Sequence, residues 1–475
     1  MTPSRLLRPL LPARLVAWPP AARALAIADL VAGADTEEAR AQRMALFAFA
    51  VRIVSAFILY ASQVVLARMM GGFEYGIFVL VWVAAVIGGG VACLGFPSAV
   101  IRFVPRYLNS GDTAALRGLV LGARVFAFVT ATVLAALALL VVHLLGSRVE
   151  SYYVLPFMLG ALALPMLALG DTQDGVSRSF SFKALALGPT FLLRPVLILA
   201  GMMGAVWWGW PPTAATALVA AIAATWVSSL VQLVWLNRTT AREVEPGPRS
   251  FHPAAWLAVA LPIFLVEGFF QLLTNVDILM VGRFMTPDEV AVYYAAVKTL
   301  ALVHFVYFAV KAGAAHRYSH YHSLGDRGAY EHFVSETVKW TFWPSVAMSV
   351  AVLAAGPFLL ALFGEGFERG YPLLFVLVVG IVARAAVGPA EAVLTMSGEQ
   401  RICALVYGVT LLVNVLLNVA LIPRYGLAGA ATATTAAMLF EAGALYAIVL
   451  RRLDLRMFVA HAHRRAAGPT GGAAA

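Results

Sequence analysis

Five cationic residues lie inside long apolar runs of this sequence: Arg52, Arg124, Arg194, Lys298 and Arg384. A charged side chain at the centre of a bilayer costs about 2.5 to 3.5 kcal/mol on the insertion scale, so five facing lipid would cost roughly 12 to 18 kcal/mol. We therefore expect them to face a water-filled cavity or to pair with acids. In a cavity of low dielectric constant, guanidinium and ammonium groups bind anions more strongly than in water. The chemistry these residues could perform is the binding of an anionic ligand.

Six acidic residues lie in the same runs and could either pair with the cations or take up a proton: Asp171, Asp174, Glu267, Asp277, Glu391 and Glu441. A carboxylate among apolar neighbours can take up a proton, which makes Asp277, Glu267 and Glu391 the candidates for energy coupling. On one continuous helix, the ten-residue spacing of Glu267 and Asp277 would place them on nearly opposite sides. Asp277 could instead pair with Arg283. Arg384 and Glu391 are two turns apart, too far for direct pairing.

Other chemistry finds little support in the sequence. His316, His320 and His322 have a spacing that could hold a metal on a helix, but they fall in a basic loop without a cysteine, so no metal site is expected. The two cysteines, Cys93 and Cys403, fall inside apolar runs and are expected to be packing residues. No phosphate-binding P-loop occurs, which excludes an ATP-driven pump within this chain. No nucleophile constellation of an enzyme is evident.

The elements that must position these charges are membrane helices. The chain has 475 residues, of which 61% are hydrophobic and 12% charged, more apolar surface than one soluble core can bury. Twelve apolar runs are each long enough to cross about 30 Å of hydrocarbon as a helix. They cover residues 44–67, 76–100, 118–145, 152–177, 184–208, 213–236, 254–282, 289–314, 334–363, 372–395, 402–422 and 427–450. The fold class is an all-α polytopic membrane protein.

The distribution of basic residues predicts the orientation of the chain in the membrane. With the N-terminus inside, the inner segments carry 23 of the 34 Lys and Arg residues and the outer links carry 5. This bias places both termini in the cytoplasm and accounts for the net charge of +10 without nucleic acid. The predicted division is a cytoplasmic tail (1–43), an N-lobe of six helices (44–238), an inter-lobe linker (239–253), a C-lobe of six helices (254–450) and a cytoplasmic tail (451–475).

An internal repeat supports two lobes. A shift of 215 places Leu66-Ala67-Arg68 on Val281-Gly282-Arg283, and the segment that begins at Glu74 falls on the one that begins at Glu289. In each copy an apolar run ends in a lone arginine, crosses a link of about six residues and restarts after an acidic residue. Such repeats are typical of secondary transporters, in which the substrate cavity lies between the halves.

Four stretches resemble the multidrug/oligosaccharidyl-lipid/polysaccharide (MOP) exporter superfamily, and within it the Wzx-type polysaccharide or O-antigen flippases. They are residues 64–78 (VVLARMMGGFEYGIF), 95–107 (GFPSAVIRFVPRY), 275–300 (NVDILMVGRFMTPDEVAVYYAAVKTL) and 414–434 (NVLLNVALIPRYGLAGAATAT). The resemblance covers about residues 44–450. It implies twelve helices in two six-helix lobes that form a V-shaped, MATE-like transporter in the bacterial inner membrane, working by alternating access.

The resemblance also implies a cargo, an undecaprenyl-diphosphate-linked oligosaccharide moved from the inner to the outer leaflet for surface or exopolysaccharide synthesis. Membrane lipids and polysaccharide assembly proteins are the implied partners. Arg52 and Lys298 lie in the first and eighth helices, which line the cavity in the proteins this sequence resembles. With help from Arg194, they are expected to hold the diphosphate. A proton or sodium ion is the candidate coupling ion, and no other cofactor is expected.

Three alternatives remain open. A drug or metabolite exporter of the same superfamily would be expected to use acids rather than Arg52 in its first helix. A flippase for the lipid-linked peptidoglycan precursor would be expected to have fourteen spans rather than twelve. A membrane glycan polymerase or acyltransferase would need a large outer loop, and the outer links are all short.

Overall fold

The computed structural model describes residues 37–146, 150–324 and 327–460, with side chains in this part except at 37–53, 183, 308–309, 312–313, 315–317 and 319–324. The chain forms two compact units, residues 1–58 and residues 59–475. All regular structure in the described residues is helical. The contacts given below are within the second unit. Most of the predicted tail 1–43 and of the tail 451–475 lies outside the described residues.

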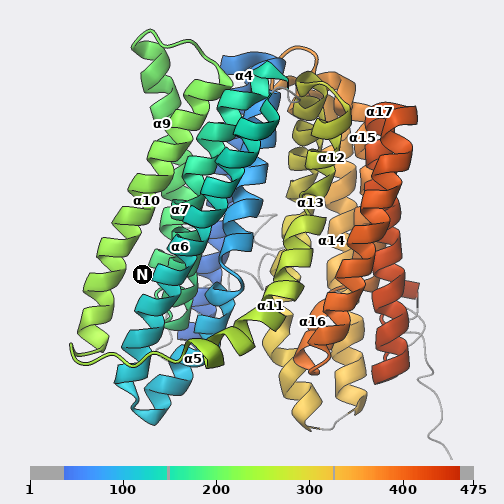
Figure 1. The fold of residues 1–475 in the computed structure, drawn as a ribbon. Coiled ribbons are helices and arrows are strands. Elements are labelled where there is room, and N and C mark those ends of the chain that lie inside the picture. The colour runs from blue at the N-terminus through green and yellow to red at the C-terminus, as the bar shows by residue number, and fades with distance from the viewer. Residues whose placement is uncertain (1–36, 147–149, 325–326, 461–475) are drawn as a thin grey trace, which may run out of the picture. The chain divides into compact units, whose positions relative to one another are not determined.

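A first series of helices precedes the linker, and Figure 1 shows most of them side by side. They are α4 (Glu37–Ala92), α5 (Phe96–Ser110), α6 (Thr113–Leu145), α7 (Ser151–Ser179), α8 (Lys183–Gly188), the π-helical turn η3 (Pro189–Leu193), α9 (Arg194–Trp207) and α10 (Ala214–Glu243). Helices α5 to α10 contact one another, with α7 packed against α5, α6 and α10. Residues 59–92 of α4 pack against α6, α7, α9 and α10, and we call this part of α4 together with α5 to α10 the first helix group.

A second series follows the linker: α11 (Pro253–Leu273), α12 (Val276–Phe284), α13 (Pro287–Leu324), α14 (Arg327–Ala361), the 3-10 turn η4 (Phe367–Gly370), α15 (Tyr371–Val387), α16 (Ala390–Met396) and α17 (Gln400–Leu453). Helices α12 to α17 contact one another and form the second helix group. Helix α11 contacts α5 of the first group and α17 of the second. Figure 1 shows it running obliquely between the two groups.

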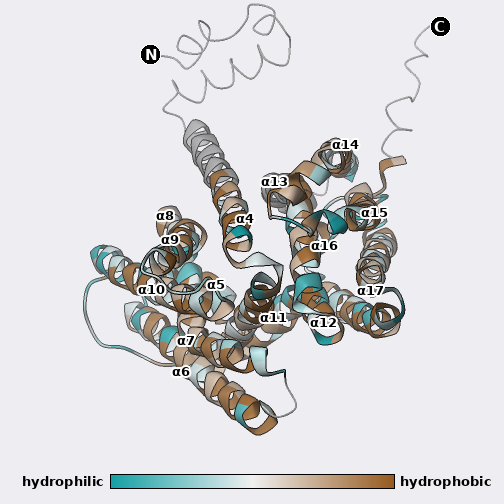
Figure 2. Ribbon diagram, turned by 90° about the horizontal axis from the view of Figure 1, so that it is seen from above, coloured by the Kyte–Doolittle hydropathy of each residue, from teal (hydrophilic) through white to brown (hydrophobic). Residues whose placement is uncertain are grey.

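Ten helical segments of the described chain are long and apolar enough to cross a membrane. The two longest, Val54–Ser110 and Gln400–Leu453, each contain a glycine with a non-helical backbone at which two helices meet. These glycines are Gly71, with φ +76°, and Gly426, with φ +57°. In Figure 2, apolar residues dominate most of these helices. A multi-pass membrane fold is confirmed, and the count of twelve spans stays a prediction.

Three predicted runs are broken in the structure. The run 76–100 passes from α4 to α5 through residues 93–95. The run 254–282 consists of α11 and α12, with Thr274 and Asn275 between them, and the run 372–395 consists of α15 and α16. The last break has a local cause, because Gly388 has a φ of +69° and is followed by Pro389, which has no backbone N–H to continue the helix. The polar and helix-breaking residues at these points are too few to interrupt the apolar pattern. The sequence therefore did not predict the breaks.

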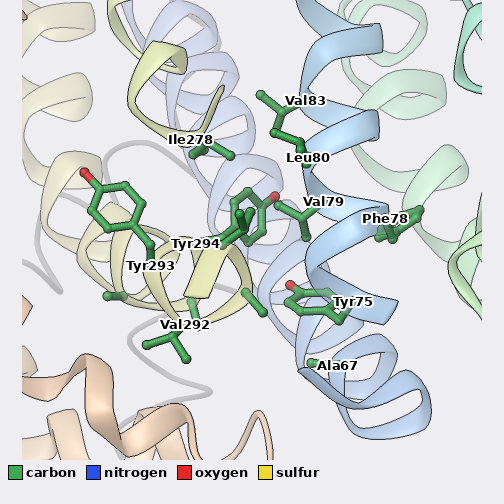
Figure 3. Close-up of a cluster of buried hydrophobic side chains, with 14 of the residues drawn as sticks. Ala67, Tyr75, Phe78, Val79, Leu80, Val83, Ile278, Val292, Tyr293 and Tyr294 are labelled. Carbon is green, nitrogen blue, oxygen red and sulfur yellow. The ribbon is translucent and has the colours of Figure 1, made fainter. Parts of the chain in front are cut away.

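The two groups meet through a core of buried side chains from α4, α12 and α13 (Figure 3). Tyr75 of α4 lies 6.2 Å from Tyr294 of α13, measured between ring centroids. Gly76 sits against the start of α13 so closely that a Cβ there would lie 1.8 Å from the carbonyl oxygen of Pro287. Only glycine permits this approach of the two backbones. We call this end of the molecule, which includes Gly71 and Thr286, the Gly71 end; it is the predicted outer end.

The opposite end carries the link between the two series, residues 244–252, and we call it the linker end. Arg117 of α6 donates hydrogen bonds from Nε to the carbonyl of Pro248 (3.1 Å) and from Nη1 to that of Glu245 (2.7 Å). The backbone N–H of Ser250 donates to the carbonyl of Ala114 at 3.0 Å. The linker is therefore fixed along the start of α6.

Candidate functional site

Of the two cations predicted to hold a diphosphate, the structure describes one side chain. Arg52 lies on α4, but its side chain is outside the described residues. Lys298 is half-buried on α13, and its Nζ lies 4.8 Å from the ring centroid of Tyr294. Since Tyr294 also contacts Tyr75 of α4, Lys298 lies one turn from a junction between the helix groups. An ammonium over an aromatic face keeps its charge available to a second, anionic partner.

Asp277 is buried at the start of α12, with 4% of its surface exposed. Its Oδ2 accepts a hydrogen bond from the hydroxyl of Tyr293 at 3.0 Å, and its Oδ1 accepts from the backbone N–H of Ile278 at 3.0 Å. The Tyr293 hydroxyl also lies 3.2 Å from the hydroxyl of Thr434 on α17. Asp277 therefore connects α12, α13 and α17. The alternative pairing with Arg283 is not observed among the described contacts, since Arg283 lies over the ring of Phe284.

Arg384 forms an ion pair inside the second helix group rather than standing alone. Its Nη2 lies 3.3 Å from Oε1 of Glu441, whose side chain is 2% exposed. The guanidinium also lies 4.9 Å from the ring centroid of Tyr307 and 6.0 Å from that of Phe270. The partner comes from α17, so helices α11, α13, α15 and α17 all contribute to one buried charge.

Glu391 belongs to the same buried region and has a different cation. Its Oε1 lies 2.9 Å from Nζ of Lys311, and its Oε2 accepts a hydrogen bond from the Tyr307 hydroxyl at 2.5 Å. The expectation that Arg384 and Glu391 do not pair directly agrees with these separate partners. Sequence reasoning missed Lys311, which lies inside the predicted run 289–314. Its place one helical turn after Tyr307 could have indicated that both side chains face the same neighbour.

In the first helix group, Arg124 and Arg194 have different surroundings. Arg124 is buried on α6 and donates from Nη1 to Oδ1 of Asn237 at 2.7 Å. Arg194 begins α9 directly after the π-helical turn and is attracted electrostatically by Asp171 and Asp174 of α7. The structure thus places Arg194 next to acids and Arg124 next to a neutral amide.

Glu267 lies on α11, and Asp277 on α12, so the two are not on one continuous helix as the spacing argument assumed. Glu267 accepts a hydrogen bond at Oε1 from the hydroxyl of Ser98 on α5, at 2.5 Å. Nearby, Nη2 of Arg102 donates to Oε1 of Gln400 on α17 at 3.0 Å. These two hydrogen bonds join the first helix group to α11 and α17. Sequence reasoning missed Ser98, because a lone serine in an apolar run carries no signal.

No group of three or more His, Cys, Asp or Glu residues in the described part of the chain is arranged to hold a metal ion. The two described cysteines are free and buried. The polar chemistry of the described spans consists of cations, carboxylates, tyrosine hydroxyls and amides.

Comparison with protein families gives two matches. The model of the polysaccharide biosynthesis protein family matches residues 43–315, which is more than half of the chain. The chain belongs to this family. The MatE family model matches residues 262–420. The two matches overlap across α11 to α13, which contain Asp277 and Lys298, and no curated protein sequence gives a significant match.

Solved structures with the same fold are transporters of low sequence identity. An inward-facing multidrug resistance MATE transporter of the MOP superfamily is 13% identical, with a TM-score of 0.66, covering 88% of this chain and 96% of its own. The lipid II flippase MurJ in an inward closed conformation is 15% identical, with a TM-score of 0.67, covering 85% and 87%. A MOP transporter from Pyrococcus furiosus is 13% identical, with a TM-score of 0.61, covering 86% and 94%. The predicted MATE-like fold is confirmed.

Proposed function

We propose that this protein is a flippase that moves an undecaprenyl-diphosphate-linked oligosaccharide from the inner to the outer leaflet of the bacterial cytoplasmic membrane. Membership in the polysaccharide biosynthesis protein family supports a glycan pathway, and the shared fold with transporters supports movement rather than covalent chemistry. The observation that carries the substrate class is Lys298, a half-buried cation beside the junction of the two helix groups. Its ammonium is suited to a phosphate group.

The test is substitution of Lys298 in a strain whose surface polysaccharide depends on this protein. Lys298→Ala is expected to lower surface polysaccharide about tenfold or more, because a charge-assisted hydrogen bond contributes about 1.5 to 3 kcal/mol. Lys298→Arg should retain part of the export, since it keeps the charge. Lipid-linked oligosaccharide should accumulate on the inner leaflet at the same time.

A matched control is Lys339→Ala, because Lys339 pairs with Glu336 one turn away on α14. It should leave export unchanged. Normal membrane abundance of Lys298→Ala together with undiminished surface polysaccharide would reject the role of Lys298 as a diphosphate ligand.

A MATE-like exporter driven by a proton or sodium ion is the second candidate, favoured by the MatE match over residues 262–420. Deletion separates the two candidates. Loss of surface polysaccharide with unchanged drug sensitivity supports the flippase. Increased sensitivity to cationic drugs with normal polysaccharide supports the exporter, with Asp277, Glu267 and Glu391 as the acids to substitute.

A further inference from the structure

The connection between α9 and α10 carries three tryptophans whose rings are mostly uncovered. Their exposed fractions are large: Trp207 91%, Trp208 86% and Trp210 52%. Two exposed prolines follow them. We call residues 207–213 the tryptophan hairpin. It lies at the Gly71 end, because the backbone N–H of Ala214, the first residue of α10, donates to Oε2 of Glu74 on α4 at 2.7 Å.

Hydrogen bonds fix the backbone of the tryptophan hairpin on both sides. Gly209 has a φ of +89°, and the N–H of Trp210 donates to the carbonyl of Ala205 at 3.0 Å. This is the glycine cap that commonly closes an α-helix. On the other side, Thr213 is the N-cap of α10, and its side chain accepts from the N–H of Thr216. The exposure of the three rings is therefore set by the fold of the connection.

No charged residue accompanies these rings. The sequence has no Asp, Glu, Lys or Arg between Arg194 and Arg238, a stretch that includes the tryptophan hairpin and most of both flanking helices. Exposed apolar patches of this kind mark sites of contact with a protein or a membrane. Tryptophan is enriched at membrane–water interfaces, because its ring is apolar while its N–H still needs a hydrogen-bond acceptor.

The tryptophan hairpin continues an apolar surface that follows α9 and α10. Both helices belong to segments long and apolar enough to cross a membrane. Apolar side chains are exposed along them: Val196, Met203, Val219, Trp226, Val227, Leu230, Val231 and Val234. On α10 this surface ends at Trp235, 21 positions after Ala214, and polar residues begin at Asn237. A helix of that length rises about 32 Å, close to the roughly 30 Å of the hydrocarbon core. Tryptophans therefore stand at both ends of a surface as long as the bilayer core is thick.

A sugar would be a poorer occupant of this surface. Binding sites for polar small molecules combine aromatic rings with several polar groups that fix the ligand. Apart from the indole N–H groups, the only polar side chain of the tryptophan hairpin is Thr213, and its hydroxyl lies 3.2 Å from that of Thr216. The chemistry of the hairpin fits an amphipathic interface better than a glycan.

We propose that Trp207, Trp208 and Trp210 insert together into the headgroup region of the bilayer at the Gly71 end, the outer leaflet in the predicted orientation, and anchor the α9–α10 connection at that depth. The rings lie among glycerol and upper acyl groups, and the indole N–H groups donate to lipid oxygens. Helix α9 packs mainly on α10 and η3, at the edge of the first helix group (Figure 1). The anchor thus holds a peripheral helix at a fixed level, whatever the substrate is.

Insertion is tested by tryptophan fluorescence of the purified protein in nanodiscs that contain brominated phosphatidylcholine. The signal of the hairpin is the difference between the wild-type protein and the triple variant Trp207→Phe, Trp208→Phe, Trp210→Phe. Bromine near the carbonyl end of the acyl chain should quench it more than bromine near the chain middle, and acrylamide should quench it weakly. The signal removed by Trp226→Phe, from the middle of α10, should show the opposite order of the two lipids. The signal removed by Trp256→Phe, from a ring that is 2% exposed, should respond little to any quencher.

Each other result overturns insertion into the lipid interface. Quenching by acrylamide without quenching by brominated lipid would place the rings in water. If soluble polysaccharide then suppressed the acrylamide quenching, the hairpin would be a glycan site instead. Quenching by neither reagent would mean that a protein partner or a second copy of the chain covers the rings.

Anchoring by the tryptophans is tested by the reaction of Pro212→Cys with a water-soluble maleimide in nanodiscs. Replacement of the three tryptophans by serine should make this reaction about tenfold faster, because a segment held at the interface by apolar side chains is shielded from water. Replacement by tyrosine should keep it slow, since tyrosine also favours the interface. Glu365→Cys, exposed at the same end, should react equally in all three backgrounds, and the native Cys93 and Cys403 are buried. Equal rates for Pro212→Cys with tryptophan and with serine overturn the anchor.

Discussion

Arg384 shows, at the scale of single residues, how a buried cation is held in this protein. Its partner Glu441 is almost fully buried, and both are enclosed by Tyr307 and Phe270. Removing one member of a buried pair leaves an uncompensated charge and costs about 3 to 5 kcal/mol, whereas replacing both by apolar residues is often neutral. The pair therefore holds α15 to α17 only as long as both charges are present.

Arg384→Met and Glu441→Leu are each expected to destabilise the protein strongly, and the double variant should recover most of the loss. The measurement is unfolding in detergent monitored by the accessibility of the buried cysteines. Lys339→Ala, which breaks an exposed pair with Glu336, is the control and should change stability by about 0 to 1 kcal/mol. A double variant as unstable as the sum of the singles would mean that the two charges act independently.

The types of these residues could be predicted from the sequence, but their partners could not. Composition and apolar periodicity showed which charges lie inside membrane helices. Pairing depends on which helices are neighbours and how each is rotated. Arg384 and Glu441 are 57 positions apart and lie on different helices, so no local spacing connects them. Lys298 remains a predicted substrate ligand, since no ion pair joins it to an acid among the described side chains.

At the scale of elements, the lengths of the apolar runs predicted most helices. The predictions failed where short polar segments or glycines break a run. Asn275 and Gly388 divide runs that read as single spans. The linker is a second case. Its sequence reads as a polar connection between lobes, yet Arg117 and Gly118 fix it along α6. Contacts between a loop and a distant helix leave no periodic pattern, so this fixed position could not be predicted from the sequence.

Gly118 gives the sharpest test of this fixed linker. A Cβ at Gly118 would lie 1.7 Å from the backbone carbonyl oxygen of Ser250, so Gly118→Ala should displace the linker. We expect cleavage by trypsin at Arg249 to become about tenfold faster, and Arg117→Ala to have the same effect. Gly204→Ala is the matched control, because a Cβ there meets no atom within 4 Å. Equal cleavage rates in all variants would show that the linker is already free.

At the scale of the whole second unit, the helix groups are joined at the Gly71 end by contacts that would break if the proposed transport separates the groups there. Nε of Arg68 on α4 donates to the carbonyl of Leu362 at 2.5 Å, just past the C-terminus of α14. Cations at a helix C-terminus are favoured by the helix dipole. The matching position in the repeat, Arg283, lies over Phe284 instead. The repeat predicted two similar halves, but not that only one of these arginines joins them.

A disulfide across this end tests whether the two groups separate during transport. A Cβ at Gly72 would lie 4.0 Å from the Cβ of Asp288, within the range of about 3.5 to 4.5 Å found in disulfides. In Gly72→Cys with Asp288→Cys, oxidation should form the bond and reduce export of surface polysaccharide about tenfold or more, and a reducing agent should restore it. Each single variant is the control, and the native Cys93 and Cys403 are buried and should not interfere. Because the lock acts on relative motion rather than on any binding residue, normal export by the fully cross-linked protein would mean that substrate passes without separation of the α4 and α13 ends.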